Sequence, residues 1–448
     1  MNLYGHVNSN HLKSISDSIL KSSYVSPGLP NSNTIYKQLA NHFKYDTFGH
    51  LQTAPVHTLF DSALLNDDKP QLWTNSTYGT QTYLPGRASK NIQTTSGVSG
   101  RAISQSRLYQ SYQSGKMLTV LITGVLSVEG PQTNIIHRIG FFDNAADKTI
   151  DDVKSGDGHY FGLDENGVFI AERSYSITGS QTETIIRQAD FNYDTIDGFG
   201  PSGFKFDPTK ANIFCLTYQW LGVGSVWMML VVDGNKIPVH HWQHSNIYDY
   251  PYTGRATLPV RYEVEALNNT LLTGTTRQIC SSVQSSGGYV PLGNIFSIDT
   301  NSTPITIDNT NYRMLIAIRK KSSHVRMTLN SVSCQIMSAG TAKVHIDVLA
   351  YPGEAPSPFS SAPTWISNNQ YSAIEYSVSP GINMDFTNGA VVDSFYYYDR
   401  ASTDIANIRS RNLFGADIEG NSDFIVLCAK SVDGNTENIY ASIQILET

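Results

Sequence analysis

Apolar residues occupy both faces of one short stretch near the middle of the chain, FCLTYQWLGVGSVWMMLVVDG at Phe214–Gly234. In an extended strand successive side chains point to opposite faces. One face of its later part would carry Val226, Met228, Leu230 and Val232, and the other Trp227, Met229 and Val231. Because neither face is charged, protein should cover both. The pattern predicts strands in the centre of a packed sandwich, with Trp220 and Leu230 buried.

Turn sequences and further runs of alternating apolar and polar residues predict strands in other parts of the chain. The sequences DENG at 164–167 and DGN at 233–235 each separate two apolar runs, which is typical of antiparallel hairpins. Alternating apolar positions at 344–350 and 439–445 predict further strands, and the prolines of 351–363 predict a loop between strands. The expected fold class is therefore all-β.

We expect three regions along the chain. A short, partly helical N-terminal arm at 1–60 precedes a central β-sandwich or jelly-roll-like domain at 61–295 and a C-terminal β-sandwich domain at 296–448. In the arm, Leu12, Ile15 and Ile19 follow helical spacing. Short isolated helices are marginal in water, so these residues are expected to dock on another subunit or protein. The alternative is an arm packed on its own domain.

Composition narrows the functional classes. Charged residues make up only 15% of the chain, against about 25% in an average soluble domain. The formal net charge of −7 gives no electrostatic reason to expect nucleic-acid binding. No signal peptide is indicated, and the longest apolar run is too short to span a membrane. We expect a soluble protein made in a cytoplasm, with no membrane partner and no cofactor.

The four cysteines lie far apart in apolar, strand-like settings and form no CxxC pair: Cys215, Cys280, Cys334 and Cys428. Buried free thiols are the expected state, because free cysteine packs as a small hydrophobe. Disulfides stay open as an alternative, since the count is even.

Two groups of side chains could bind a metal ion. His240 and His244 lie four strand residues apart, which separates them by roughly 13 Å, so one ion cannot bridge them within a chain. We expect these histidines and His241 to serve packing or hydrogen bonding, the alternative being a metal site on a three-fold axis. Five aspartates precede Gly158, and a solvated loop is favoured over a calcium site for them. They are Asp143, Asp147, Asp151, Asp152 and Asp157.

No arrangement of catalytic residues is evident in the sequence. Glycoside hydrolysis needs two carboxylates across a sugar, whereas Glu263 and Glu265 share one face of a predicted strand. The chain has no GxSxG elbow, P-loop or HExxH motif. We therefore predict that the protein is not an enzyme, with polysaccharide degradation as a remote alternative.

Aromatic residues supply the candidates for a subunit-facing or glycan-facing surface. Such rings suit interfaces because one end is apolar and the other is wet. The candidates are Trp242, Tyr248, Tyr250, Tyr252, Tyr396, Tyr397 and Tyr398. The competing interpretation is that alternate members of these runs belong to the core.

Several sequence blocks, taken in order, resemble a family of virion structural proteins of large double-stranded DNA viruses, above all tailed phages and cyanophages. They include DTFGHLQTAPVHTLFDS at 46–62, QSRLYQSYQSGKMLTVLITG at 105–124, the block 187–234, LPVRYEV at 258–264 and ICSSVQSSGGY at 279–289. Together the blocks span most of the chain. The resemblance carries over no catalytic residue.

The resemblance implies a structural component of a virus particle. Such a protein, whether capsid-associated, fibre or tail, would act through contacts with other virion proteins and with itself, as a homotrimer or another closed oligomer. Its location would be the virion, assembled in the host cytoplasm. The alternative function is recognition of host-surface glycans from the exterior of the particle.

Overall fold

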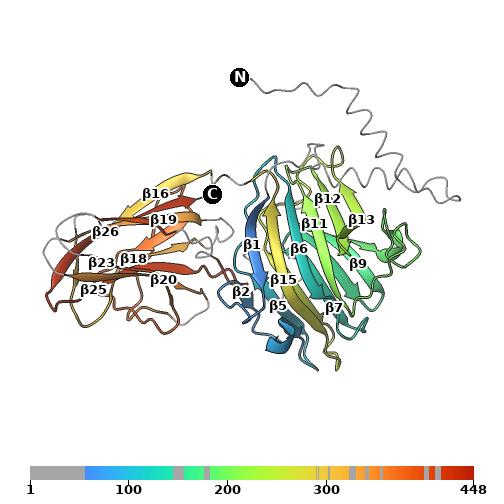
Figure 1. Cartoon of the computed structure of the whole chain (residues 1–448), viewed down its shortest axis with the longest axis horizontal. Helices are drawn as coiled ribbons and strands as arrows, with labels where there is room; N and C mark the ends of the chain where they lie inside the picture. Colours follow the sequence, from blue (N-terminus) through green and yellow to red (C-terminus); the bar gives the residue numbers. More distant parts are fainter. Residues whose placement is uncertain are drawn as a thin grey trace, which may run out of the picture. The chain divides into compact units, whose positions relative to one another are not determined.

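A computed structural model describes residues 56–144, 156–175, 182–288, 290, 292–300, 303–321, 329–338, 343–353, 357–397, 403–408 and 415–447 (Figure 1). These residues are all-β, as the sequence predicted: apart from two short 3-10 helices, η1 (Pro85–Arg87) and η2 (Gln188–Asp190), their regular elements are strands. Within the described part of the chain, no helix is long and apolar enough to cross a membrane. The predicted arm residues Leu12, Ile15 and Ile19 lie outside the described residues.

The strands between residues 57 and 285 form two antiparallel sheets, which we call the first sandwich. The eight-stranded sheet runs β13 (Asn235–Gln243), β12 (Ser225–Val232), β11 (Ala211–Tyr218), β6 (Leu118–Val125), β15 (Thr275–Ser285), β4 (Ser89–Gln93) and β3 (Thr80–Leu84), with β1 (His57–Ala63) also paired to β15. The seven-stranded sheet runs β10 (Thr182–Arg187), β9 (Gly167–Ser174), β8 (Gly158–Asp164), β7 (Ile135–Phe142), β14 (Val260–Ala266), β5 (Gly100–Ser106) and β2 (Trp73–Asn75).

The strands from residue 294 onward form a second pair of antiparallel sheets, the second sandwich. The five-stranded sheet runs β16 (Asn294–Asp299), β26 (Glu437–Glu447), β19 (Leu329–Ser338) and β24 (Thr403–Ile408), with β17 (Ile305–Ile307) also paired to β26. The six-stranded sheet runs β21 (Ile366–Ser367), β22 (Ile374–Ser377), β18 (Arg313–Lys320), β25 (Phe424–Ser431), β20 (Val344–Tyr351) and β23 (Ala390–Tyr397). Residues 53–448 form one compact unit, so the domain boundary after residue 295 stays a prediction.

The stretch that first indicated a sandwich forms most of β11, all of β12 and the turn that leads into β13, and these three strands lie side by side in one sheet (Figure 1). Leu230 lies in the core at 1% exposure, and Met229 on the opposite face is buried at 1%, which confirms that protein covers both faces. Trp220 is only partly buried, because it lies in the loop between the two strands and its Nε1 donates to the Thr253 carbonyl at 3.2 Å.

The turn between β12 and β13 has the backbone geometry that its sequence predicts. Asp233 and Gly234 have φ values of 50° and 78°. Positive φ at both central residues is the signature of the tight hairpin turns whose twist matches that of the flanking strands. The turn therefore sets the register in which Leu230 pairs with Ile237.

Each sandwich has its own apolar core, and the cysteines contribute to both. Cys215, Cys334 and Cys428 are buried free thiols, as predicted, while Cys280 is free and half-buried. Burial raises the pKa of Cys215 to about 11, so its thiol stays protonated and unreactive at neutral pH.

Candidate functional site

Three side chains line up across neighbouring strands of the six-stranded sheet. In the register of this sheet, Arg319 on β18 lies opposite Glu375 on β22 and opposite Phe424 on β25. Alternation along β18 directs Ile316 and Ile318 into the core of the second sandwich, and these two side chains are fully buried. Antiparallel pairing thus brings a cation, a carboxylate and an aromatic ring together from sequence positions far apart.

The guanidinium of Arg319 is held on two sides. Its Nε and Nη2 lie 2.8 Å and 2.7 Å from Oε2 of Glu375. Its Cζ lies 4.3 Å from the ring centre of Trp365, and the Trp365 ring stacks on Phe424 with centroids 5.9 Å apart and planes 20° apart. Planar guanidinium groups favour this combination of a forked ion pair and a stacked ring.

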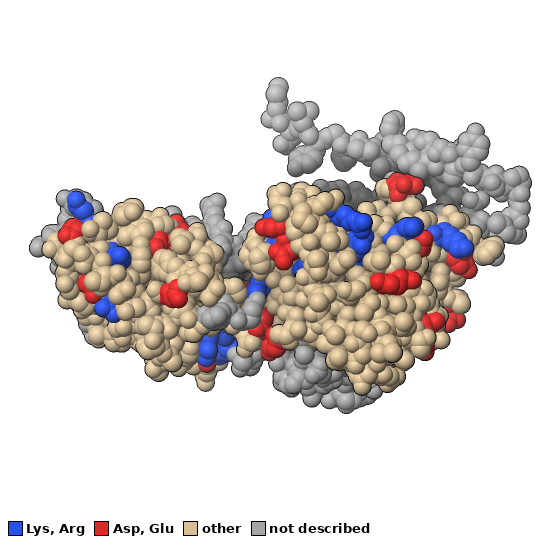
Figure 2. All heavy atoms as spheres, turned by 90° about the horizontal axis from the view of Figure 1, so that it is seen from below, with Lys and Arg blue, Asp and Glu red and all other residues tan. Residues whose placement is uncertain are grey.

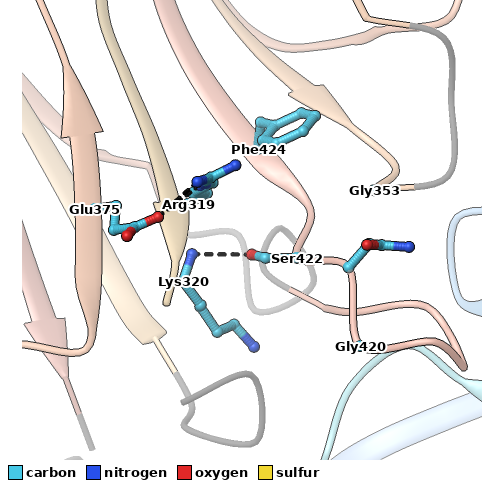
Figure 3. A pocket seen from close by; sticks show the side chains of 8 residues that line it. Arg319, Lys320, Gly353, Glu375, Gly420, Ser422 and Phe424 are labelled. Atoms are coloured by element: carbon cyan, nitrogen blue, oxygen red, sulfur yellow. Dashed lines mark hydrogen bonds and ion pairs between the residues drawn. The ribbon is translucent and has the colours of Figure 1, made fainter. Parts of the chain in front are cut away.

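These groups border a pocket of about 240 Å³ in the second sandwich (Figure 3). The lining residues are Arg319, Lys320, Gly353, Glu375, Gly420, Asn421, Ser422 and Phe424. Arg319 and Glu375 point toward each other, whereas the Lys320 side chain points away from that pair (Figure 3). Burial lowers the pKa of Lys320 to about 8, partly offset by the Asp423 carboxylate.

A tight turn builds the rim of the pocket. Asp417 accepts hydrogen bonds from the backbone N–H and from Nδ2 of Asn421, each at 2.7 Å, so the Asn421 side chain is held in place. Gly353 approaches this turn so closely that a Cβ on it would lie 2.5 Å from the Asn421 carbonyl oxygen. Any larger residue at position 353 would therefore displace the rim.

The side chains of the Arg319–Glu375 pair are 34% and 27% exposed, so a ligand can reach them. Glu375 engages two of the five N–H groups of Arg319, which leaves three donors at the pocket among the described residues. Glu375 is also the sole carboxylate among the eight described lining residues. The pocket thus offers donors, acceptors and an aromatic wall, without the carboxylate pair that sugar hydrolysis uses.

The paired glutamates of the first sandwich occupy a different environment. Glu263 and Glu265 do share one face of β14, and both accept hydrogen bonds from Nη1 of Arg138, at 2.8 Å and 2.7 Å. Burial would raise the pKa of Glu263, but Arg101, Arg138 and Arg261 outweigh it and lower that pKa to about 2. A permanently ionised, enclosed carboxylate of this kind is unsuited to donating a proton in catalysis.

The structure corrects two of the predicted aromatic surface residues. Tyr252 is 0% exposed and Tyr397 is 3% exposed, so neither presents its ring to a ligand. Both were placed on a surface because they lie in runs of aromatics, but their side chains pack into the cores of the two sandwiches.

The remaining aromatic candidates differ in exposure. Tyr248 and Tyr250 stack on each other at 5.3 Å in the loop after β13, and Trp242 packs partly against the core. Tyr396 is 73% exposed and stacks on His345 at 4.4 Å. Tyr398 lies outside the described residues.

The structure also shows the surroundings of several histidines and aspartates that were considered as metal ligands. No group of three or more potential metal ligands lies close together within the described part of the chain. His240 accepts a hydrogen bond from the Asn192 backbone at 3.2 Å, in line with the predicted hydrogen-bonding role. Asp143 and Asp157 are buried, so the prediction of a solvated loop was wrong for these two, while Asp147, Asp151 and Asp152 lie outside the described residues.

Sequence reasoning missed the whole pocket. Residues 314–319 have the apolar composition of a buried strand. The arginine that ends this run has no partner nearby in the sequence, because its partners lie in other strands. The strand β22 has only four residues and pairs with β18 from far along the chain, so this pairing has no local signal. No local signal joins Trp365, Glu375 and Phe424, because they lie far apart in the sequence.

The charged residues of the visible face are scattered singly or in small groups among uncharged ones (Figure 2). That face carries no continuous basic surface of the type that tracks a nucleic-acid backbone.

No family model and no curated protein matches this chain. Among solved structures it is similar to an endo-β-1,4-glucuronan lyase from the fungus Trichoderma reesei, at 13% identity over 51% of this chain and 95% of the lyase, with a TM-score of 0.36. It is also similar to a β-glucanase from Bacillus licheniformis (10% identity, 52% and 99% covered, TM-score 0.32) and to the carbohydrate recognition domain of Emp47p (13% identity, 52% and 97% covered, TM-score 0.32). These likenesses are too distant to carry an argument about activity.

Proposed function

We propose that this chain is a structural component of a virus particle that binds carbohydrate through the Arg319 pocket and catalyses no reaction. The observation that carries the binding role is the cross-strand row of Glu375, Arg319 and Phe424. The placement in a virion rests on the ordered sequence blocks that resemble virion proteins.

The chemistry of the pocket supports carbohydrate as the ligand class. A sugar ring presents an apolar C–H face, which packs on aromatic rings, and a rim of hydroxyl groups that both donate and accept hydrogen bonds. Phe424 supplies a ring, Arg319 supplies free N–H donors, and Asn421 is fixed at the rim. A purely apolar ligand would leave these polar groups unpaired, which costs free energy.

Self-association would strengthen binding by such a shallow, half-exposed pocket. A homotrimer or another closed oligomer would present the same pocket several times, and linked sites raise the effective affinity without any new contact. Light scattering should therefore show an oligomer at tens of micromolar, which is roughly the concentration at which weak specific contacts saturate.

The binding role is tested with a panel of neutral and acidic oligosaccharides, measured by isothermal calorimetry. At least one class should bind, and both Arg319→Ala and Phe424→Ala should weaken it by about ten-fold or more. The matched control is Tyr371→Ala, an aromatic residue of the same sandwich that is 80% exposed and lies outside the pocket lining. Absence of any saccharide binding at millimolar concentration, or an equal loss in the control, would refute the role.

The virion placement has a separate test. Peptides of this chain should be detected by mass spectrometry in gradient-purified particles, and labelling of intact particles with an antibody should place it on the exterior. A chain that is absent from purified particles contradicts this half of the proposal and leaves the saccharide result standing. Release of sugars from the same panel by the purified protein would contradict the non-catalytic half.

A further inference from the structure

A buried lysine side chain connects the two sheets of the first sandwich. Lys90 on β4 is 0% exposed, and Ile92, two residues further along the same face of this strand, belongs to the apolar core. Nζ of Lys90 donates a hydrogen bond to Oδ1 of Asn75 at 3.1 Å. Lys90 belongs to the eight-stranded sheet and Asn75, on β2, to the seven-stranded sheet, so this contact crosses from one sheet to the other.

The surroundings of Nζ favour an uncharged amine. Among the described residues Asn75 is the one hydrogen-bond partner of Nζ, although an ammonium group carries three N–H donors. The centre of the Trp73 ring lies 5.9 Å from Nζ. Burial lowers the pKa of Lys90 to about 8, and the Asp68 carboxylate offsets part of this effect. A desolvated lysine of this kind is a nucleophile.

The side-chain amide carbon of Asn75 is within reach of that amine. Cγ is bonded to Oδ1, so Nζ lies roughly 3.3–4.3 Å from Cγ, close to the separation from which bonds form. Asn75 is fixed by the pairing of β2 with β5, where it lies opposite Ser104. Lys90 is fixed by pairing on both sides of β4, where it lies opposite Tyr83 and Gln278. Both groups are therefore held on paired strands.

We propose that Lys90 and Asn75 react with each other to form an isopeptide bond between the two sheets of the first sandwich. Nζ of the uncharged amine attacks Cγ, and Oδ1 takes the negative charge of the intermediate. The Nζ–Cγ bond forms and the Cγ–Nδ2 bond breaks. One proton passes from Nζ to Nδ2, which leaves as ammonia. An amine and an amide become a new amide and ammonia, so the step needs no oxidant, reductant or second substrate.

The Asp68 carboxylate can carry the proton between the two nitrogens. It acts on the charge of Lys90, and it is half-buried in the segment between β1 and β2. Attack places a positive charge on Nζ, and this nitrogen must lose a proton before Nδ2 can depart as ammonia. A nearby base that accepts the proton and returns it to Nδ2 therefore speeds the reaction.

The bond would give the first sandwich a covalent link that its cysteines do not supply. All four cysteines of the chain are free thiols. The proposed link closes a loop at residues 75–90, which contains β3 and η1. A cross-link of this kind removes conformations mainly from the unfolded chain, as a disulfide does. It would also keep β2 attached to β4 when the sheets are pulled apart.

Peptide mass spectrometry of the full-length protein without any substitution tests the proposal. Trypsin cleaves after arginine and unmodified lysine but not before proline, so a linked chain should yield one branched peptide made of residues 45–87 and 88–101. Its mass should be one ammonia below the sum of the two peptides, and fragmentation should place the branch at Lys90 and Asn75. Complete cleavage after Lys90, which releases the peptide 91–101, would overturn the proposal. This readout does not depend on a variant folding.

Substitutions identify the reacting groups. Lys90→Met and Asn75→Ala each remove one of them, so neither variant should yield the branched peptide, and finding it in either would overturn the proposal. The matched control is Lys116→Met, which alters a lysine of the same sandwich whose Nζ donates to the Gly288 backbone carbonyl, and it should retain the link in full. In Asp68→Asn the branched peptide should form at least about ten-fold more slowly after synthesis. An unchanged rate would overturn the role of Asp68.

Discussion

The two sandwiches contain the same pair of residues on neighbouring antiparallel strands, in two different surroundings. Arg138 on β7 lies opposite Glu263 on β14, and Arg319 on β18 lies opposite Glu375 on β22. The first pair is 6% and 0% exposed, whereas the second is 34% and 27% exposed. The distances are alike, at 2.8 Å and 2.7 Å, so exposure is what separates them.

The difference shows how burial changes what an ion pair does. Around Glu263 the charges have been removed from water, and this carboxylate is contacted by Arg101, Arg138 and Arg261 together. A ligand cannot reach this network, because its side chains are at most 6% exposed. In the second sandwich water and ligands reach Arg319, so the pair adds little to stability but keeps donors available for binding.

The largest expected effect comes from removing the central charge of the buried network. Glu263→Gln leaves three arginines without their shared counter-charge and should lower the free energy of unfolding by about 3–5 kcal/mol. Urea denaturation followed by fluorescence measures this. The matched variant Glu375→Gln should cost less than about 1 kcal/mol, because its pair is half-exposed. Equal costs for the two variants would show that burial does not distinguish the pairs.

Acid should destabilise the first sandwich through a buried histidine and two buried carboxylates. Burial and Arg138 lower the pKa of His137 to about 3, so the folded protein keeps this ring neutral while the unfolded chain takes up a proton below about 6.5. Stability is therefore complete above pH 6.5 and declines as the pH falls toward 3. Between pH 7 and pH 4 the loss should be on the order of 2–3 kcal/mol in urea denaturation.

The carboxylates add a further loss at lower pH. The folded-state pKa values of Glu172 and Glu263 are about 2, below their ordinary value, so their contribution is present above pH 4.5 and disappears as the pH falls through 2. His137→Gln should reduce the loss between pH 7 and pH 3 and leave the loss below pH 3 unchanged. If that variant shows the same decline down to pH 4, His137 is not its source.

A conservative change in the exposed pair should affect binding and spare stability. Arg319→Lys keeps the charge but loses the planar fork that contacts Glu375 and stacks on Trp365. Saccharide affinity should fall about ten-fold, while the urea midpoint should move by less than the equivalent of about 1 kcal/mol. The reverse result, with stability lost and affinity unchanged, would assign Arg319 a structural role.

The smallest effect concerns two buried tyrosines of the first sandwich. The hydroxyl of Tyr262 contacts the Thr123 carbonyl at 2.9 Å and Ser281 Oγ at 2.9 Å, whereas the buried hydroxyl of Tyr252 has no hydrogen-bond partner among the residues that the structure describes. Tyr262→Phe should cost roughly 1–2 kcal/mol, and Tyr252→Phe should be neutral or slightly stabilising. Thermal unfolding of the two variants side by side measures the difference. A marked loss in Tyr252→Phe would reveal a bound water at that hydroxyl.

The local sequence pattern was sufficient to predict the strands, but it was not sufficient to predict the candidate site residues. The all-β class, the hairpin turn at Asp233 and Gly234, and the burial of Leu230 follow from alternation and turn chemistry within a few residues. The aromatic runs, by contrast, led to two wrong placements, Tyr252 and Tyr397. Tyr397 lies on β23, where one residue of register reverses the direction of every side chain, and Tyr252 lies in a loop whose path no local pattern encodes.

The amino-acid sequence by itself determined that this chain forms strands and where several of its turns lie. Those properties depend on neighbours along the chain. Tertiary structure alone decided that Glu263 is enclosed by arginines while Glu375 borders a pocket, and that Lys90 reaches Asn75. Each of these contacts joins residues from different strands, and cross-strand distances depend on pairing partners, register and the covering of each sheet face, none of which a local pattern encodes.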